Sequence, residues 1–236
     1  MKKGKKKQAP HSALTLTEGE QLLGWVYLAV EMLVLPSAIA LLGSNFGGFS
    51  PGISNFLYYL TNAVCCAVIF RALLVRSLLR AGDGFADLLS AALIGLLLLL
   101  GANQITGALA ELLVPDFVNA NNAAISAMVA QHPFLLSFAL VALVPVGEEC
   151  LFRGLMFAGW YQRNRMGAYV LSVVGFAVVH VSAYLGSTDP LSLFLAFLQY
   201  VPAGIILAWS FERSGSLFAP ILIHAAVNAG SILALR

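Results

Sequence analysis

The feature that most constrains this fold is a series of apolar runs, each about 20 residues long, the length at which a helix crosses a bilayer. Between these runs lie short stretches rich in Gly, Pro, Asn, Asp and Ser, residues typical of turns. Only 10% of the 236 residues are charged, whereas about a quarter are charged in soluble domains. The sequence therefore predicts an all-α integral membrane protein.

The apolar runs also predict the number of spans. We expect them at about 21–43, 54–76, 86–108, 133–160, 168–185, 191–210 and 216–234. The segment 112–131 ends in NANNAAISAMVAQ and is open to two interpretations, an interfacial helix or half of an eighth span. No internal repeat or soluble second domain is visible in the sequence. We therefore expect one polytopic transmembrane bundle of seven to eight spans.

Basic residues predict how the chain is oriented. Five of its thirteen Lys and Arg residues lie in the N-terminal MKKGKKK, where they suit contact with anionic lipid but predict no nucleic-acid surface. If that end is cytoplasmic, alternate linkers place six arginines on the same side: Arg71, Arg76, Arg80, Arg163, Arg165 and Arg213. We expect a cytoplasmic N-terminus, and the brief linkers favour a prokaryotic cytoplasmic membrane.

A few polar residues interrupt the apolar runs, and polar groups at membrane depth are costly enough to suggest function. Glu149 and Arg153 are four residues apart on one helical face, which predicts an ion pair with a structural role. Glu148 points about 100° away round the helix and is left as the unpaired carboxylate. Glu31 in the first span is open to two interpretations, a structural residue or part of a cavity lining.

Three further polar residues fall at a similar depth. With a helical rise of about 1.5 Å per residue, Glu148 lies roughly 21 Å and His180 roughly 18 Å from the cytoplasmic ends of their spans. His224 and Asn228 lie roughly 12 and 18 Å in, and both project from one face of the last span. The sequence therefore predicts a polar pocket near mid-membrane, reached from the cytoplasmic half.

These residue types suit hydrolysis by an activated water. A desolvated carboxylate has a raised proton affinity, so we assign Glu148 as the general base that takes a proton from water. His180 would hold the same water, and the paired donors of His224 and Asn228 would stabilise the charge on a carbonyl oxygen. No Ser or Cys is paired with a histidine by a recognisable motif, and Cys65, Cys66 and Cys150 are expected as core residues.

Three polar blocks follow one another along the chain: Glu148-Glu149-Cys-Leu-Phe-Arg153, Phe176-Ala-Val-Val-His180 and His224-Ala-Ala-Val-Asn228. In this order they resemble the CPBP family of intramembrane proteases, which includes the CAAX prenyl endoproteases and the bacteriocin-linked Abi proteins. The resemblance covers about Phe134 to Ile232. It implies the same roles: Glu148 and His180 on the water, and His224 with Asn228 at the oxyanion. Phe176 is expected to pack so that it seats His180.

The resemblance also bears on metal and on architecture. Glu148, His180 and His224 could in principle ligate zinc, but the His-Glu-x-x-His motif of zinc proteases is absent, so we favour no cofactor. We expect a conical intramembrane polar cavity within the helical bundle. The expected divisions are a basic tail over 1–20, N-terminal transmembrane helices over 21–132, and a CPBP-like catalytic core over 133–236.

The predicted function is thus an intramembrane endopeptidase that cuts a membrane-anchored protein or peptide, near its C-terminus. Two alternatives remain. One is a bacteriocin or abortive-infection immunity protein with the same fold. The other is a proton-coupled transporter in which Glu148, His180 and His224 form a relay. A relay would not need Asn228, and transporters usually show two related halves, which this sequence lacks. Oligomeric state and prenylation of the substrate are left open.

Overall fold

The structure is a computed structural model that describes residues 14–234, and every regular element in that range is helical. The elements are, in chain order, α1 Glu18–Leu33, α2 Leu35–Ser44, α3 Pro51–Ile69, α4 Arg71–Asp83, α5 Phe85–Leu113, α6 Ala120–Gln131, α7 Pro133–Phe138, η2 Ala139–Leu143, α8 Val144–Glu149, η3 Cys150–Ala158, α9 Gly159–Tyr161, α10 Arg165–Ser182, α11 Pro190–Ser214 and α12 Phe218–Leu233. The lysines of the expected basic tail lie outside the described residues.

Five helical segments of the described chain are long and apolar enough to cross a membrane: 51–69, 85–113, 133–161, 165–182 and 190–214. A sixth span is added if α1 and α2, which meet at a 50° bend, count as one. The seventh expected span corresponds to α12, an apolar helix of 16 residues. The segment open to two interpretations contains α6, which has 12 residues and is too short to span alone.

Residue choice explains where several helices begin and end. Thr17 and Glu20 form a capping box at the start of α1, so the helix begins inside the segment expected as a tail. Asn164 and Asp189 each accept a hydrogen bond from a backbone N–H of the helix that follows, α10 and α11. Gly215 ends α11 in the left-handed conformation, with φ of 68°.

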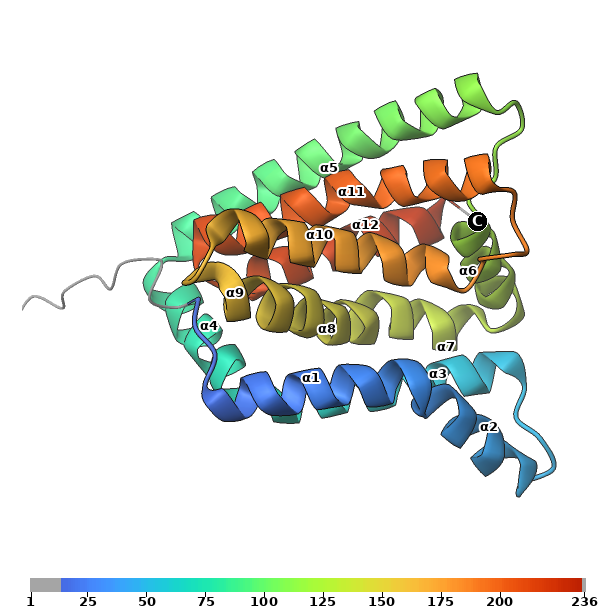
Figure 1. The fold of residues 1–236 in the computed structure, drawn as a ribbon, viewed down its shortest axis with the longest axis horizontal. Helices are drawn as coiled ribbons and strands as arrows, with labels where there is room; N and C mark the ends of the chain where they lie inside the picture. Colours follow the sequence, from blue (N-terminus) through green and yellow to red (C-terminus); the bar gives the residue numbers. More distant parts are fainter. Residues whose placement is uncertain (1–13, 235–236) are drawn as a thin grey trace, which may run out of the picture.

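The segment 133–161 is the central helix of the bundle. It joins α7, α8 and α9 through two π-helical stretches, η2 and η3, which lie on either side of α8. Figure 1 shows it running between α1 and α3 on one side and α10 and α12 on the other. In its most apolar stretch 50% of the residues are buried, against 22–33% in the corresponding stretches of the other four spans. Because π-helical turns rotate the faces of a helix and recur at functional sites, this segment is where a site is expected.

The outer surface of the bundle is apolar. Leu97, Leu112 and Val68 are among many large hydrophobic side chains that are more than half exposed. Such a surface has no favourable contact with water, whereas lipid tails solvate it. The chain is therefore an integral membrane protein whose apolar outer surface contacts lipid.

Candidate active site

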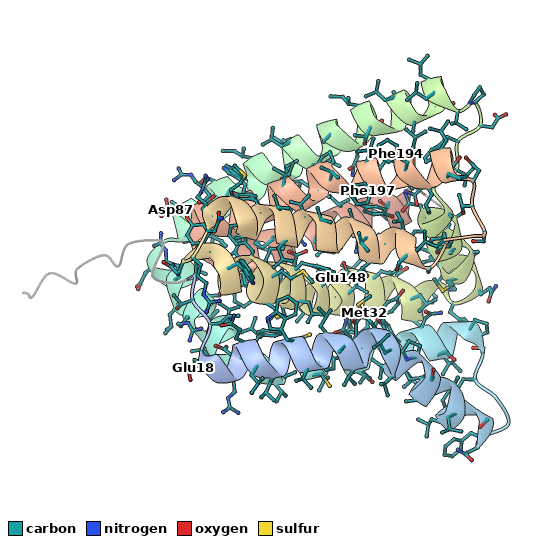
Figure 2. The ribbon with its side chains drawn as sticks, in the orientation of Figure 1. Glu18, Met32, Asp87, Glu148, Phe194 and Phe197 are labelled. Carbon is teal, nitrogen blue, oxygen red and sulfur yellow. The ribbon has the colours of Figure 1, made fainter. Side chains whose placement is uncertain are left out.

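Glu148 lies between two histidines from different helices. Its Oε2 atom is 3.7 Å from Nε2 of His180 in α10 and 3.9 Å from Nε2 of His224 in α12. The side chains of His180 and His224 are 14% and 10% exposed, and that of Glu148 is 22% exposed. Figure 2 shows Glu148 in the middle of the bundle, on the central helix. The structure thus brings together three of the four residues that the sequence predicts for catalysis.

The orientation of His180 is set by its own helix. Its Nδ1 atom lies 2.8 Å from the carbonyl oxygen of Phe176, one turn earlier. A carbonyl can only accept, so Nδ1–H donates and, in the neutral ring, Nε2 carries the lone pair. That lone pair faces Glu148. The ring also lies against Phe176 and Tyr200, with centroids 4.3 Å away in each case, so the expectation that Phe176 seats His180 agrees with this packing.

The expected ion pair between Glu149 and Arg153 is present, and it has a third member. Oε1 of Glu149 lies 3.2 Å from Nη1 of Arg153 and 2.8 Å from Nδ1 of His224. Both charged side chains are completely buried. Arg153 also lies over the ring of Phe176, at 4.5 Å from its centroid, and donates to the carbonyl of Gly204. Glu149 therefore orients His224, a contact that helical spacing alone did not indicate.

Two carboxylate oxygens of this cluster have no hydrogen-bond partner among the described residues. They are Oε2 of Glu148 and Oε2 of Glu149, and both atoms are buried. A buried polar atom without a partner is costly, and such atoms are often kept for chemistry. For Glu148 the orphan oxygen is the same atom that faces His180 and His224.

Asn228 lies one helical turn beyond His224 and makes a different contact. Its Nδ2 atom donates to the carbonyl of Leu140, at 2.8 Å, in the π-helical stretch η2. That carbonyl belongs to the central helix, one element before Glu148. One amide N–H of Asn228 is therefore engaged with backbone, and the other is the donor that remains for a ligand.

Glu31 belongs to a separate buried network. It accepts hydrogen bonds from the hydroxyl of Tyr58 and from Nδ2 of Asn62, and Asn62 in turn accepts from Tyr27. A Cβ atom on Gly147 would lie 3.0 Å from the Asn62 side chain, so this network packs directly against the residue before Glu148. Of the two interpretations of Glu31, the structural one agrees with these contacts.

Two tyrosines of the buried networks were not singled out by the sequence. The ring of Tyr200 in α11 packs against His180 in a tilted arrangement, and its hydroxyl accepts from Asn121 of α6, at 3.0 Å. Tyr58 faces Glu31 from α3. Each lies in an apolar run, where a tyrosine is an ordinary packing residue. The only available signal was the asparagine cluster 119–122, whose partner across the bundle could not be identified from one sequence.

The His, Cys, Asp and Glu side chains of the structure are the ones that could hold a zinc ion. Within residues 14–234, no group of three or more His, Cys, Asp or Glu side chains is arranged to hold a metal ion. The buried site pairs one carboxylate with Arg153 and aims the other at two imidazoles. The expectation that no cofactor takes part stays a prediction.

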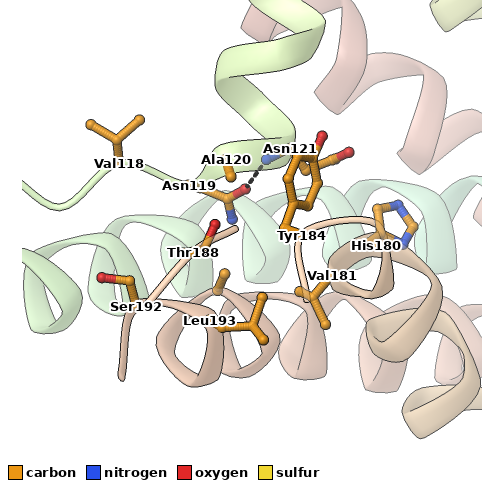
Figure 3. A pocket seen from close by; sticks show the side chains of 11 residues that line it. Val118, Asn119, Ala120, Asn121, His180, Val181, Tyr184, Thr188, Ser192 and Leu193 are labelled. Atoms are coloured by element: carbon orange, nitrogen blue, oxygen red, sulfur yellow. Dashed lines mark hydrogen bonds between the residues drawn. The ribbon is translucent and has the colours of Figure 1, made fainter. Parts of the chain in front are cut away.

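A shallow hollow of about 10 Å³, open to the surroundings, lies beside His180 at one end of the bundle. It is formed by the start of α6, the end of α10 and the start of α11, as Figure 3 shows. Its polar lining includes Asn119, Asn121, Tyr184 and Thr188. The hollow lies at the end of the bundle opposite to the start of α1 (Figure 1). Access to the site from the cytoplasmic half stays a prediction.

Comparison with known proteins agrees with the C-terminal location of this cluster. Residues 130–230 match the family model described as type II CAAX prenyl endopeptidase Rce1-like. The chain is also similar to the "UPF0177 protein in abiGi 5'region" of Lactococcus lactis subsp. cremoris, with 30% identity over 97 residues. That alignment covers 41% of this chain and 37% of the relative, so the match spans well under half of either protein. No solved structure matches the chain significantly. The C-terminal part of this chain is thus similar to Rce1-like CAAX prenyl endopeptidases, which confirms its resemblance to the CPBP family.

Proposed function

We propose that this protein is an intramembrane endopeptidase of the CAAX-protease type, in which Glu148 activates water. The observation that carries the proposal is the facing of Glu148 Oε2 and His180 Nε2, 3.7 Å apart. An ionised carboxylate and the lone pair of a neutral imidazole are both acceptors. A molecule with two O–H donors, such as water, can therefore bridge them by donating one hydrogen bond to each. Both groups can accept a proton from that water.

The proposed reaction starts from that bridging water. As its oxygen forms a bond to the carbonyl carbon of the substrate, Glu148 takes one of its protons, and the carbonyl oxygen gains negative charge. When the C–N bond breaks, Glu148 gives the proton to the departing nitrogen, so the product amine is neutral. One carboxyl and one amino terminus result, with the carboxylate base restored. This use of one carboxylate as base and then acid needs no covalent intermediate.

The oxyanion that develops on the substrate carbonyl needs hydrogen-bond donors, and we assign this role to His224 and Asn228. Nδ1–H of His224 points at the Glu149 carboxylate, so its Nε2 donates when the ring is protonated. The neighbouring carboxylates of Glu148 and Glu149 favour that protonated ring, while Arg153 offsets part of the Glu149 charge. Asn228 would contribute the amide N–H that Leu140 does not use. Donors aimed at such charge typically contribute about 10²–10³ in rate.

The substrate would be a membrane-anchored protein or peptide, since the site lies inside a bundle that faces lipid. We propose that the N-terminus is cytoplasmic. Arginines from distant segments gather with acidic partners at the end where α1 begins, in the pairs Arg76–Glu20 and Arg165–Glu212. This clustering of cations at one end supports the orientation. A prokaryotic cytoplasmic membrane remains our assignment of compartment.

A role without turnover is the second candidate. The name of the lactococcal relative places that protein in the 5' region of abiGi, which favours an immunity-linked function as the alternative. Transport has less support, because Asn228 is bonded to backbone and cannot carry a proton.

The test is cleavage by the purified chain in nanodiscs, with a library of membrane-anchored peptides and product analysis by mass spectrometry. Wild type is expected to release a fragment, and Glu148→Gln and His180→Ala are expected to release none. Glu18→Gln is the matched control, since Glu18 is an exposed carboxylate in the first turn of α1. Full activity in Glu148→Gln would overturn the assignment. No cleavage by any form would favour the immunity-linked role.

A further inference from the structure

Tyr200 packs against the His180 imidazole from a different helix, α11. The ring centroids of Tyr200 and Phe176 both lie 4.3 Å from that of His180, and they lie 6.1 Å from each other. The two rings are therefore on adjacent sides of the imidazole and not on opposite ones. Phe176 belongs to the same helix as His180 and moves with it. Of these two contacts, only the one with Tyr200 holds the imidazole against another helix.

The backbone bond of His180 does not fix the direction of its ring by itself. Nδ1–H donates to the carbonyl of Phe176, which selects the tautomer, but a bond at one edge of a ring lets the ring swing about that edge. His180 also lies in the last turn of α10, which ends at Ser182, and the ends of helices fray. A second contact is needed to keep Nε2 directed at Glu148, 3.7 Å away.

The hydroxyl group of Tyr200 is engaged with the start of α6. It accepts from Nδ2 of Asn121, at 3.0 Å. A hydroxyl has one hydrogen to donate, and Oδ1 of Asn122 and Oδ1 of Asn119 lie 3.3 and 3.5 Å away to receive it. Because this hydrogen is used within the chain, Tyr200 is not placed as a proton donor to substrate. Its hydroxyl instead attaches the ring to α6.

The first turn of α6 is itself held against α11. Asn119 caps α6 by accepting from the N–H groups of Asn121 and Asn122, and its Nδ2 donates to Oε1 of Gln199, at 2.8 Å. Figure 3 shows Asn119 and Asn121 where α6 begins, on the same side of the view as Tyr184. Hydrogen bonds between neutral side chains hold helices together inside membranes. The start of α6 and the ring of Tyr200 are therefore coupled in position.

We propose that Tyr200 is a positioning residue, whose ring directs the His180 imidazole toward Glu148 and whose hydroxyl anchors that ring to α6. The role of His180 in this inference rests on the proposed function. The ring provides the packing and the hydroxyl only anchors it, so the two parts of the side chain are separable. Loss of the ring should release the imidazole, whereas loss of the hydroxyl alone should loosen it only in part.

Cleavage kinetics in nanodiscs separate the two parts. Tyr200→Leu removes both, and kcat is expected to fall at least about tenfold, because a misplaced catalytic group loses rate steeply. KM should change little, since Tyr200 holds the imidazole and not the substrate. Tyr200→Phe keeps the ring and should retain most of the kcat that Tyr200→Leu loses. An unchanged kcat in Tyr200→Leu, or an equal loss in both variants, would overturn the inference.

Phe194→Leu is the matched control for these kinetics. Phe194 is an aromatic residue of the same helix, and its side chain is 56% exposed. The change from an aromatic ring to leucine at this position should leave kcat as in wild type. If Phe194→Leu lowers kcat as much as Tyr200→Leu, the loss comes from α11 as a whole and the positioning role is wrong.

Asn121→Ala tests the anchor. It removes the amide that donates to the Tyr200 hydroxyl, and alanine is well suited to a helix. This variant should lower kcat no more than Tyr200→Phe does. Combining the two changes should add little, because both break the same bond. Losses that multiply in the double variant would mean that α6 and Tyr200 act independently, which would overturn the anchor.

A signal from the imidazole reports its orientation without any turnover. The chain has four histidines, so labelling with ¹³Cε1-histidine gives few NMR signals, and the one missing in His180→Ala belongs to His180. That signal is expected to be narrow in wild type and in Tyr200→Phe, and to broaden in Tyr200→Leu as the ring begins to swing. A signal equally narrow in Tyr200→Leu would overturn the inference. If wild type cleaves no peptide, the proposed function fails, while this signal still decides whether Tyr200 positions His180.

Discussion

Nδ1 of His224 lies 2.8 Å from Oε1 of Glu149, although 75 residues separate the two in sequence. The same ring turns Nε2 toward Glu148, at 3.9 Å. Glu148 and Glu149, which are adjacent in α8, thus face the two ring nitrogens of the same imidazole, His224. This is possible because their side chains point about 100° apart round the helix. Glu149 therefore acts on the proposed reaction through His224, as a positioning residue, in addition to its bond with Arg153.

Glu149→Gln should separate positioning from catalysis. The amide keeps the size of the side chain but removes the charge that favours a protonated His224, so kcat is expected to fall about tenfold. KM should change little, because Glu149 is completely buried and has no access to substrate. Steady-state kinetics in nanodiscs give both values. A fall in thermal stability with an unchanged kcat would show that the residue is only structural.

Arg153→Met should be less stable than wild type. The guanidinium is fully buried and pairs with Glu149, so its loss leaves an uncompensated carboxylate in the core. Breaking such a pair costs about 3–5 kcal/mol, which should lower the yield of folded protein. The double variant Glu149→Gln/Arg153→Met should recover part of the loss, because both charges are gone. A double variant less stable than Arg153→Met would contradict the ion-pair account. The measurement is thermal unfolding in detergent.

The sequence predicted the helical class, because span length and turn residues are local properties. The count of seven to eight spans stays a prediction, since five described segments, or six with the bent pair α1 and α2, are long and apolar enough to span. The sequence did not predict the break at Phe70, which divides the expected span 54–76 between α3 and α4. Nor did it predict the π-helical stretches around Glu148, since these depend on packing against α3, α10 and α12 and not on any local pattern.

The candidate site divides in the same way. Helical spacing was enough to predict the Glu149–Arg153 pair, and depth along the helices was enough to predict that Glu148, His180 and His224 meet. Spacing and depth did not predict the other contacts between helices. The bond from Asn228 to the Leu140 carbonyl and the packing of Tyr200 against His180 depend on how each helix is rotated, which one sequence does not determine.

Gly204→Ala should destabilise the contact between α10 and α11. An added Cβ would lie 3.0 Å from Cα of Val173, a backbone atom that cannot move without shifting its helix. Close approach at small residues is a main source of helix association in membranes. Gly101→Ala is the matched control, because no atom lies within 4 Å of the added Cβ and alanine favours the helix. The thermal midpoint should fall only for Gly204→Ala. Equal midpoints would contradict the packing described.

Gly147→Ala should lower activity through Asn62. The new Cβ would meet the Asn62 side chain at 3.0 Å, directly before Glu148. Since the network of Glu31 and Asn62 packs here, the methyl group is expected to displace the carboxylate and reduce kcat/KM about tenfold. Asn62→Ser shortens the opposing side chain, and adding it to Gly147→Ala should restore part of the activity. If the losses of activity from Gly147→Ala and Asn62→Ser simply add in the double variant, the two positions are not in direct contact and the explanation is wrong.

The claim at the centre of this account is that water, activated by Glu148, attacks the peptide bond. A single turnover in H₂¹⁸O, with enzyme in excess over one cleavable anchored peptide, tests it most directly. We predict one ¹⁸O atom in the new carboxyl group of the product and none in the protein. An unlabelled product together with ¹⁸O in the peptide that contains Glu148 would mean that the carboxylate itself attacks, and would contradict the account.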